Sequence, residues 1–137
     1  MGGDHSAESY DSIEKFVFSD IDENIISRNF DIDQHYNYVM SSLDNSYNGI
    51  NKYVYGNILQ AIKAIVNCKI YHLKSPVKAH AIAFLHQEVL FSPTMIQRIL
   101  FLFKVDMGIP QILKASDKVF ADKPEPVWIQ RFFGGVN

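Results

Sequence analysis

Two aspartates one residue apart are the first side chains of this sequence that could do chemistry. The stretch "KFVFSDIDENIIS", residues 15–27, places Asp20 and Asp22 at the end of an apolar run. Paired carboxylates can divide nucleophilic and acid–base work, because one can attack while the other carries a proton. An acidic first turn of a helix has the same letters, so the pair alone leaves both interpretations open.

Composition limits the classes of protein that the chain can be. With 137 residues, of which 47% are hydrophobic, it can bury one sizeable core, and we expect a single domain. A single cysteine, Cys68, excludes an internal disulfide framework and suits a reducing compartment. No apolar run reaches the roughly 18 residues of a membrane span. We therefore expect a cytoplasmic protein with no stable membrane association.

The charges are unevenly distributed, although the net charge is only −2. Residues 1–50 contain ten acidic and two basic side chains, whereas residues 51–137 contain eleven basic and five acidic ones. The two parts can offset one another by packing together. Because the basic residues are scattered rather than clustered with aromatic ones, we expect no nucleic-acid partner.

Apolar runs and helical patterns alternate along the chain after a polar segment, residues 1–14, that we expect to be flexible. "KFVFSD" (15–20) has the composition of a buried strand, although Ile13, Val17, Ile21 and Ile25 recur every four residues, as in a helix. The other strand candidates are 68–73 and 98–106. The helix candidates are 31–44, 51–67, 75–90, 107–121 and 127–133, with "NSYNG" (45–49) as a turn. This alternation predicts an α/β domain with a parallel sheet, and an all-α bundle is the alternative.

Three segments together resemble the haloacid dehalogenase (HAD) superfamily of phosphatases, in particular its pyrimidine 5′-nucleotidase-like branch. "FVFSDIDENI" (16–25) resembles the first motif, an apolar strand that ends in Asp-x-Asp. "KIYHLKSPVKAHAIAFL" (69–85) is similar to the second motif and its helix, and "DKPEPVWIQRFFGGVN" (122–137) to the third, which supplies a lysine. The resemblance covers residues 15–137. It implies a Rossmann-like core, with residues 31–66 as an inserted helical cap.

The resemblance also implies a mechanism for a small phosphorylated substrate such as a nucleoside monophosphate. Asp20 would attack phosphorus and form an aspartyl-phosphate, and Asp22 would protonate the leaving oxygen. Lys123 would neutralise the transferring group, and Mg²⁺ would be bound by Asp20 and Asp22. In the second motif a hydroxyl should bind phosphate; here Lys74 stands at that position, and Ser75 follows it.

The sequence also departs from the family pattern. Asn24 replaces the usual threonine or valine, and the acidic fourth motif, which would follow almost directly after residue 137, is missing. The chain therefore resembles a C-terminally incomplete member of the family, with fewer carboxylates for Mg²⁺. Its first strand would be an exposed edge, which favours a homo-oligomer. The second hypothesis is a noncatalytic helical interaction module with degenerate motifs.

Overall fold

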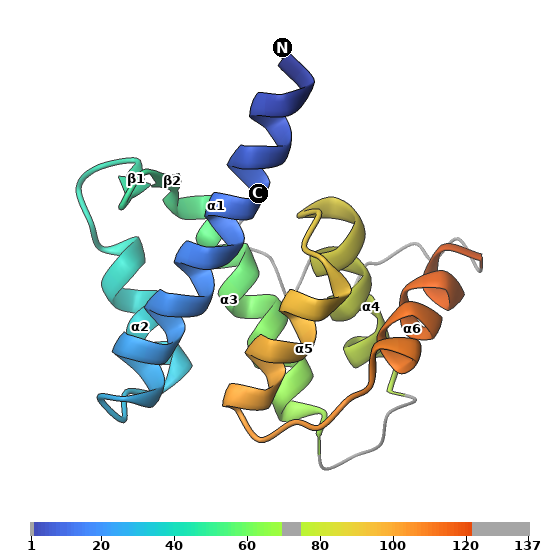
Figure 1. Ribbon diagram of the computed structural model, residues 1–137. Helices are drawn as coiled ribbons and strands as arrows, with labels where there is room; N and C mark the ends of the chain where they lie inside the picture. The colour runs from blue at the N-terminus through green and yellow to red at the C-terminus, as the bar shows by residue number, and fades with distance from the viewer. Residues whose placement is uncertain (1, 70–74, 122–137) are drawn as a thin grey trace.

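The computed structural model describes residues 2–69 and 75–121, and in these ranges the protein is helical apart from one short hairpin (Figure 1). Two helices continue into a single wider, π-helical turn, labelled η. The elements in chain order are α1 (Gly2–Ile21), η1 (Asp22–Ile26), α2 (Ile32–Met40), β1 (Ser46–Tyr47), β2 (Ile50–Asn51), α3 (Lys52–Asn67), α4 (Pro76–Ala83), η2 (Phe84–Glu88), α5 (Pro93–Leu102) and α6 (Ile109–Ala121).

The prediction of an α/β core with a parallel sheet is wrong, and the all-helical alternative is confirmed. In the described part of the chain, the sheet consists of β1 and β2, which pair antiparallel. The predicted strand 15–20 is the last part of α1. Val17 and Ile21 are buried while Lys15 and Ser19 are exposed, which is the periodicity of a helix with one buried face.

The predicted strand 98–106 is wrong for the same reason. Its first half belongs to α5, in which Met95, Ile96, Ile99 and Leu100 form a buried stripe and Phe101 points to solvent. A short apolar run is compatible with either structure, and the packing of the stripe against the core decides for the helix. The third strand candidate, 68–73, lies almost entirely outside the described residues.

The helices expected around the turn "NSYNG" are confirmed. Asp31 caps α2 by accepting a hydrogen bond from the Gln34 amide at 2.6 Å. Between the two helices, Asn48 (φ 52°) and Gly49 (φ 89°) occupy the left-handed region, as a tight Asn-Gly hairpin turn requires. Asn51 then caps α3 by accepting hydrogen bonds from two amides of its first turn. The segment expected as a cap insertion, 31–66, therefore forms α2, the hairpin and α3.

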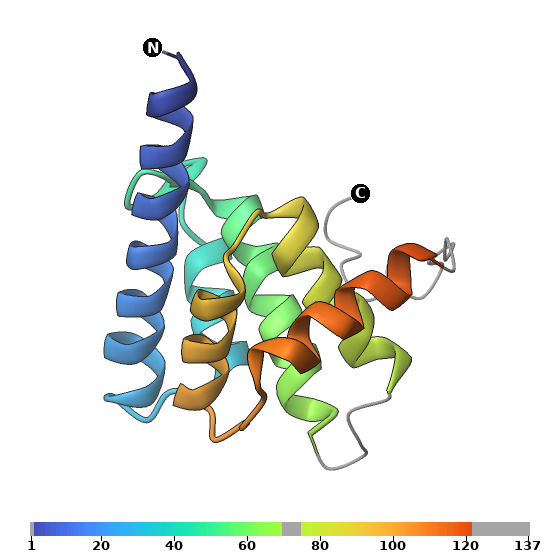
Figure 2. The same ribbon diagram turned by 45° about the vertical axis from the view of Figure 1, so that its right-hand side comes forward.

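Helix α3 is the centre of the core. Its inward face, which includes Ile58, Leu59, Ile62 and Ile65, is fully buried. Helix α3 has α2 as a neighbour and also packs against α4, and α6 lies across α4 and α5 (Figure 2). The described residues contain no helix with the length and apolar content needed to cross a membrane.

Helix α1 is fastened to α5 by polar contacts as well as by packing. The Glu14 carboxylate accepts a hydrogen bond from the Ser92 amide, 78 residues away, at the start of α5. A carboxylate at this position offsets the positive end of the helix dipole. One helical turn further along α1, the Phe18 ring has the Arg98 guanidinium 4.3 Å from its centroid. These contacts hold the C-terminal half of α1 against the core.

Candidate functional site

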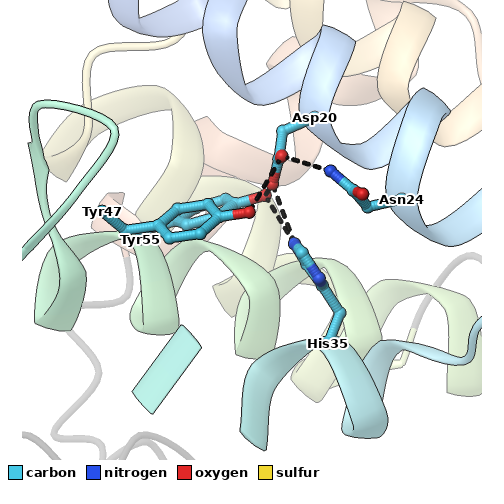
Figure 3. A network of polar contacts seen from close by, with 5 residues as sticks. All are labelled: Asp20, Asn24, His35, Tyr47 and Tyr55. Carbon is cyan, nitrogen blue, oxygen red and sulfur yellow. Dashed lines mark hydrogen bonds and ion pairs between the residues drawn. The ribbon is translucent and has the colours of Figure 1, made fainter. Parts of the chain in front are cut away.

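Asp20 is the centre of a buried polar network that joins α1 to α2, the hairpin and α3 (Figure 3). Its Oδ2 lies 2.8 Å from His35 Nε2 and accepts a hydrogen bond from the Tyr55 hydroxyl. Its Oδ1 accepts hydrogen bonds from Asn24 Nδ2 at 2.6 Å and from the Tyr47 hydroxyl at 3.2 Å. Asp20 is 6% exposed, His35 1% and Tyr55 0%. One carboxylate thus collects four partners in the interior.

Local structure explains why these side chains converge. Asn24 lies in η1, four residues after Asp20, and reaches back along the same helix. His35 lies on the buried face of α2, between Ile32 and Val39. Tyr55 follows in the first turn of α3, so the capped start of that helix fixes its ring position.

Aromatic rings enclose the network. The rings of Tyr47 and Tyr55 stack with centroids 5.6 Å apart and planes 15° apart. Phe16 contacts Tyr55 edge-on, also at 5.6 Å, and His35 contacts Tyr47 edge-on at 6.0 Å. Both geometries are favourable for aromatic pairs. The rings keep water away from the carboxylate, so its interactions take place in a medium of low polarity.

The electrostatics follow from this enclosure. Burial by itself raises the pKa of Asp20, but hydrogen bonds from His35 and Tyr55 lower it, and the pKa ends below its ordinary value of 3.8. The pKa of the Tyr55 hydroxyl is raised, first by burial and then by the Asp20 charge. Tyr47 is affected in the same way. At neutral pH Asp20 is therefore a carboxylate that accepts from two neutral phenols.

This arrangement suits a structural role better than catalysis. A carboxylate offers about four lone-pair positions, and four protein groups already lie within hydrogen-bonding distance of Asp20. A nucleophile or magnesium ligand needs lone pairs that point to the substrate or the metal. Here they point at the protein itself, so an incoming phosphate or Mg²⁺ would first have to displace these partners.

Asp22 does not join Asp20. Two residues apart on an extended chain the side chains share a face, but on a helix they point to nearly opposite sides. Asp20 points into the core, and Asp22, the first residue of η1, is partly exposed. The structure therefore separates the two carboxylates that the phosphatase mechanism needs to act together.

Of the remaining predicted site residues, the structure describes Ser75, which lies far from the network. Ser75 is the N-cap residue of α4, and its hydroxyl lies 3.4 Å from the buried Cys68 sulfur. Cys68 follows the last turn of α3 and Tyr55 lies in its first, 13 residues earlier, so the two are about 20 Å apart along the helix. Lys74 and Lys123 lie outside the described residues.

The expected Mg²⁺ finds no matching ligand set among the side chains that the structure describes, residues 12–69 and 75–117. No three carboxylate, histidine or cysteine side chains there come together as a metal centre requires. The hydrogen bonds of Asp20 and the orientation of Asp22 fit the ion poorly. Phosphatase activity and Mg²⁺ binding remain predictions from the sequence resemblance.

Sequence reasoning singled out Asp20 but missed its partners His35, Tyr47 and Tyr55. These residues lie 15, 27 and 35 positions after Asp20 in the sequence. One signal was present: His35 falls on the same helical face as Ile32 and Val39, so a polar ring is placed on an apolar stripe. A buried histidine needs a hydrogen-bond partner, and the nearest acidic candidates precede it in the chain.

A second buried polar cluster lies between η2 and α6. The hydroxyl oxygen of Ser116, which is fully buried, accepts a hydrogen bond from Gln87 Nε2 at 2.7 Å. His86 Nδ1 lies 3.2 Å from the same oxygen and can accept the hydroxyl proton. A serine beside a histidine resembles a nucleophile and its base, but this hydroxyl is closed off from solvent. The cluster joins α6 to η2.

The described residues also include an apolar surface at the C-terminal end of α5. Two grooves, of about 420 and 470 Å³, meet there and share Leu102 as a wall. The first lies between α1 and α5, and the second between the end of η1, α3 and the residues after α5. Phe101 is 67% exposed and Phe30 44%. We call this pair of grooves the α5-end surface; no member of the Asp20 network lines it.

Comparison of the chain with protein-family models, with curated proteins and with solved structures gave no match. The fold alone therefore defines the class of protein. In its described residues the chain is helical apart from one short hairpin, and it contains a buried Asp–His–Tyr network.

Proposed function

We propose that this protein is a noncatalytic helical interaction module that binds a partner through the α5-end surface. The observation that carries the proposal is the state of Asp20, the residue expected to be the nucleophile. Its carboxylate is buried and directed at four groups of the protein, so it stabilises the fold. The hypothesis of a phosphatase would need this side chain to face a substrate.

The α5-end surface supports the binding part of the proposal. Exposed aromatic side chains on a globular protein are ordinary when they are isolated, but side chains gathered around grooves are typical of binding sites. Phe101 and Phe30 stand on the rims of two adjoining grooves, together with the partly exposed Ile26. The C-terminal ends of α1 and α5 lie side by side (Figure 2), and residues of both helices line the first groove.

The cytoplasmic location is part of the same proposal. Its support is the single cysteine of the chain, which is free and buried beside Ser75. Proteins that work in oxidising compartments usually contain paired cysteines when they are small.

Photo-crosslinking tests the binding function. A photo-reactive amino acid replaces Phe101 in one variant and Leu43 in another, and each is irradiated in an extract of the cells that make the protein. Leu43 is fully exposed and lines neither groove, so it is a matched control. We expect discrete adducts from position 101 that are absent from position 43. The same adducts from both positions, or none from position 101, would contradict the proposal.

A turnover assay tests the noncatalytic part. The wild-type chain is incubated with nucleoside monophosphates and small sugar phosphates, with and without Mg²⁺, and phosphate release is measured. We expect no release above that of Asp20→Asn. Mg²⁺-dependent release that disappears in the variant would restore the phosphatase hypothesis.

A further inference from the structure

On the basis of the proposed binding function, we propose that the occupant of the α5-end surface is an acidic amphipathic helix of a partner protein. The inference concerns the chemistry of the occupant, which the proposed function leaves open. Three properties of the surface carry it: the shape of the grooves, the charges around them and the backbone of the turn between them.

The shape favours a helix over a strand. A partner strand needs an exposed sheet edge to pair with, and the strands of the described residues are only two residues long each. The α5-end surface instead offers two adjoining apolar grooves divided by Leu102. A helix presents apolar side chains three, four and seven residues apart, so one face can place an anchor in each groove. Phe101 and Phe30 would pack beside these anchors.

Within the grooves, most of the acidic groups are already engaged by the protein. The Asp33 carboxylate pairs with Lys63 at 2.6 Å. Asp31 accepts the hydrogen bond that caps α2. These groups therefore offer little to a partner, and Asp106, an exposed acid on the wall of the first groove, is the exception.

Two of the three basic side chains that line the grooves are not engaged in this way. Arg98 and Lys104 are exposed, and neither has a carboxylate within ion-pair distance among the described residues. Arg98 stacks on Phe18, an arrangement that leaves the N–H groups at the edge of its planar guanidinium free to donate. Each groove thus has one cation without an ion-pair partner among the described residues, since Lys63 in the second groove is paired with Asp33. A partner with carboxylates on either side of its apolar face matches these two cations.

The turn after α5 fixes the backbone at Lys104 and pairs carbonyl groups at the end of the helix. Lys104 has a φ of 64° and ends α5 in a Schellman motif, in which its own amide bonds to the Phe101 carbonyl and the Val105 amide to the Leu100 carbonyl. These carbonyls at the negative end of the helix are thus already paired, which lessens the repulsion that an acidic partner would meet.

Two synthetic peptides test the inference. Each has about 15 residues, enough for a helix to form on binding, with leucines spaced three, four and seven apart. One peptide carries glutamates at the flanking positions and the other carries lysines at the same positions. Binding of each labelled peptide to the full chain is measured by fluorescence anisotropy over a range of salt concentrations.

We expect the acidic peptide to bind at least about tenfold more tightly than the basic one, with a difference that shrinks as salt screens the charges. Phe101→Ser should weaken binding of the acidic peptide about tenfold or more, since an exposed aromatic anchor is lost. Lys104→Glu should weaken it about threefold or more and favour the basic peptide. Leu43→Ser, a change of a fully exposed apolar side chain that lines neither groove, should leave both affinities unchanged.

Several results would overturn the inference. Equal binding of the two peptides, a preference for the basic one, or no binding of either would each reject an acidic helix. A dimer in sedimentation velocity that is lost in Phe101→Ser would identify a second copy of the chain as the occupant. If crosslinks form at position 101 while the acidic peptide fails to bind, the binding function stands and only the identity of the partner is wrong.

Discussion

The described part of the chain has two π-helical turns, and each carries part of a buried polar cluster, but the clusters differ in charge. The first, η1, contributes Asn24 to the carboxylate of Asp20. The second, η2, contributes His86 and Gln87 to the hydroxyl of Ser116. An inserted residue that widens a helix re-aims the side chains around it, and here both turns aim them inward. The resemblance to the HAD superfamily singled out Asp20 in the charged cluster. Both clusters nevertheless have the same structural role, which is to join helices.

The difference in charge predicts a difference in energy. A buried carboxylate that loses a donor is left with part of its desolvation cost unbalanced, whereas a neutral hydroxyl that is removed takes its own cost with it. The α1–α3 half should therefore tolerate a change of polar residues less well than the α4–α6 half. The next three predictions measure this contrast, in order of decreasing expected effect.

Tyr55→Phe should lower the free energy of unfolding by about 2 kcal/mol, because a hydrogen bond to a buried charge is lost without a change in packing volume. Urea unfolding followed by circular dichroism gives the value. Tyr53→Phe is the matched control on the same helix, since Tyr53 is 48% exposed, and it should change the free energy very little. Equal effects of the two changes would contradict the role assigned to the Asp20 network.

Protonation of Asp20 at acidic pH should lower the free energy of unfolding. The loss should be somewhat smaller than the total contribution of the Asp20 network. The pKa of Asp20 is lowered in the fold, so its stabilising contribution is complete above the unfolded value of 3.8. The contribution is lost as the pH falls below 3.8 towards the lower pKa of the folded state. We expect the difference in unfolding free energy between the wild type and Asp20→Asn to be constant at neutral pH and to shrink below pH 3.8. A difference that does not vary with pH would contradict the assignment of the charge to Asp20.

Ser116→Ala should cost about 1 kcal/mol, because the lost partner is neutral and both Gln87 and His86 are only partly buried. The same urea titration measures it, and the loss should not depend on pH between 3 and 5, in contrast to that of Asp20→Asn. A cost as large as that of Tyr55→Phe would remove the distinction between the two clusters.

Lys104→Gly should raise the free energy of unfolding by about 0.5–1 kcal/mol, because glycine adopts the left-handed conformation at the end of α5 without strain. Thermal unfolding followed by circular dichroism detects the gain. Lys104→Ala keeps the strain and serves as the control for loss of the side chain. An equal gain in Lys104→Ala would mean that the loss of the lysine charge, and not the backbone conformation, causes the effect.

The sequence patterns predicted the helices better than the sheet. The caps Asp31 and Asn51 and the Asn-Gly turn between them are local signals, and helices begin near Pro76 and Pro110 as expected. The strands predicted at 15–20 and 98–106 failed because a short apolar run has no periodicity of its own. The four-residue spacing of Ile13, Val17, Ile21 and Ile25 was the better guide, since Val17, Ile21 and Ile25 form the buried stripe of α1 and η1.

The site was only half predictable. Asp20 was singled out for a reactive role, whereas the structure gives it a role in the fold. Its partners come from α2, the hairpin and α3, so their convergence depends on tertiary packing that no local motif encodes. The α5-end surface was missed for a similar reason, because it combines side chains from α1, α3 and the residues after α5.

The measurement that tests the account most directly compares Asp20→Asn with Asp22→Asn in urea unfolding and in phosphate release. Asp20→Asn should cost about 3 kcal/mol, because an amide cannot accept from all four partners of the buried carboxylate. Asp22→Asn should change stability by less than about 0.5 kcal/mol, since Asp22 is partly exposed. Neither variant should differ from the wild type in phosphate release. Release that both changes abolish, with little effect of either on stability, would contradict the account and assign the aspartate pair to catalysis.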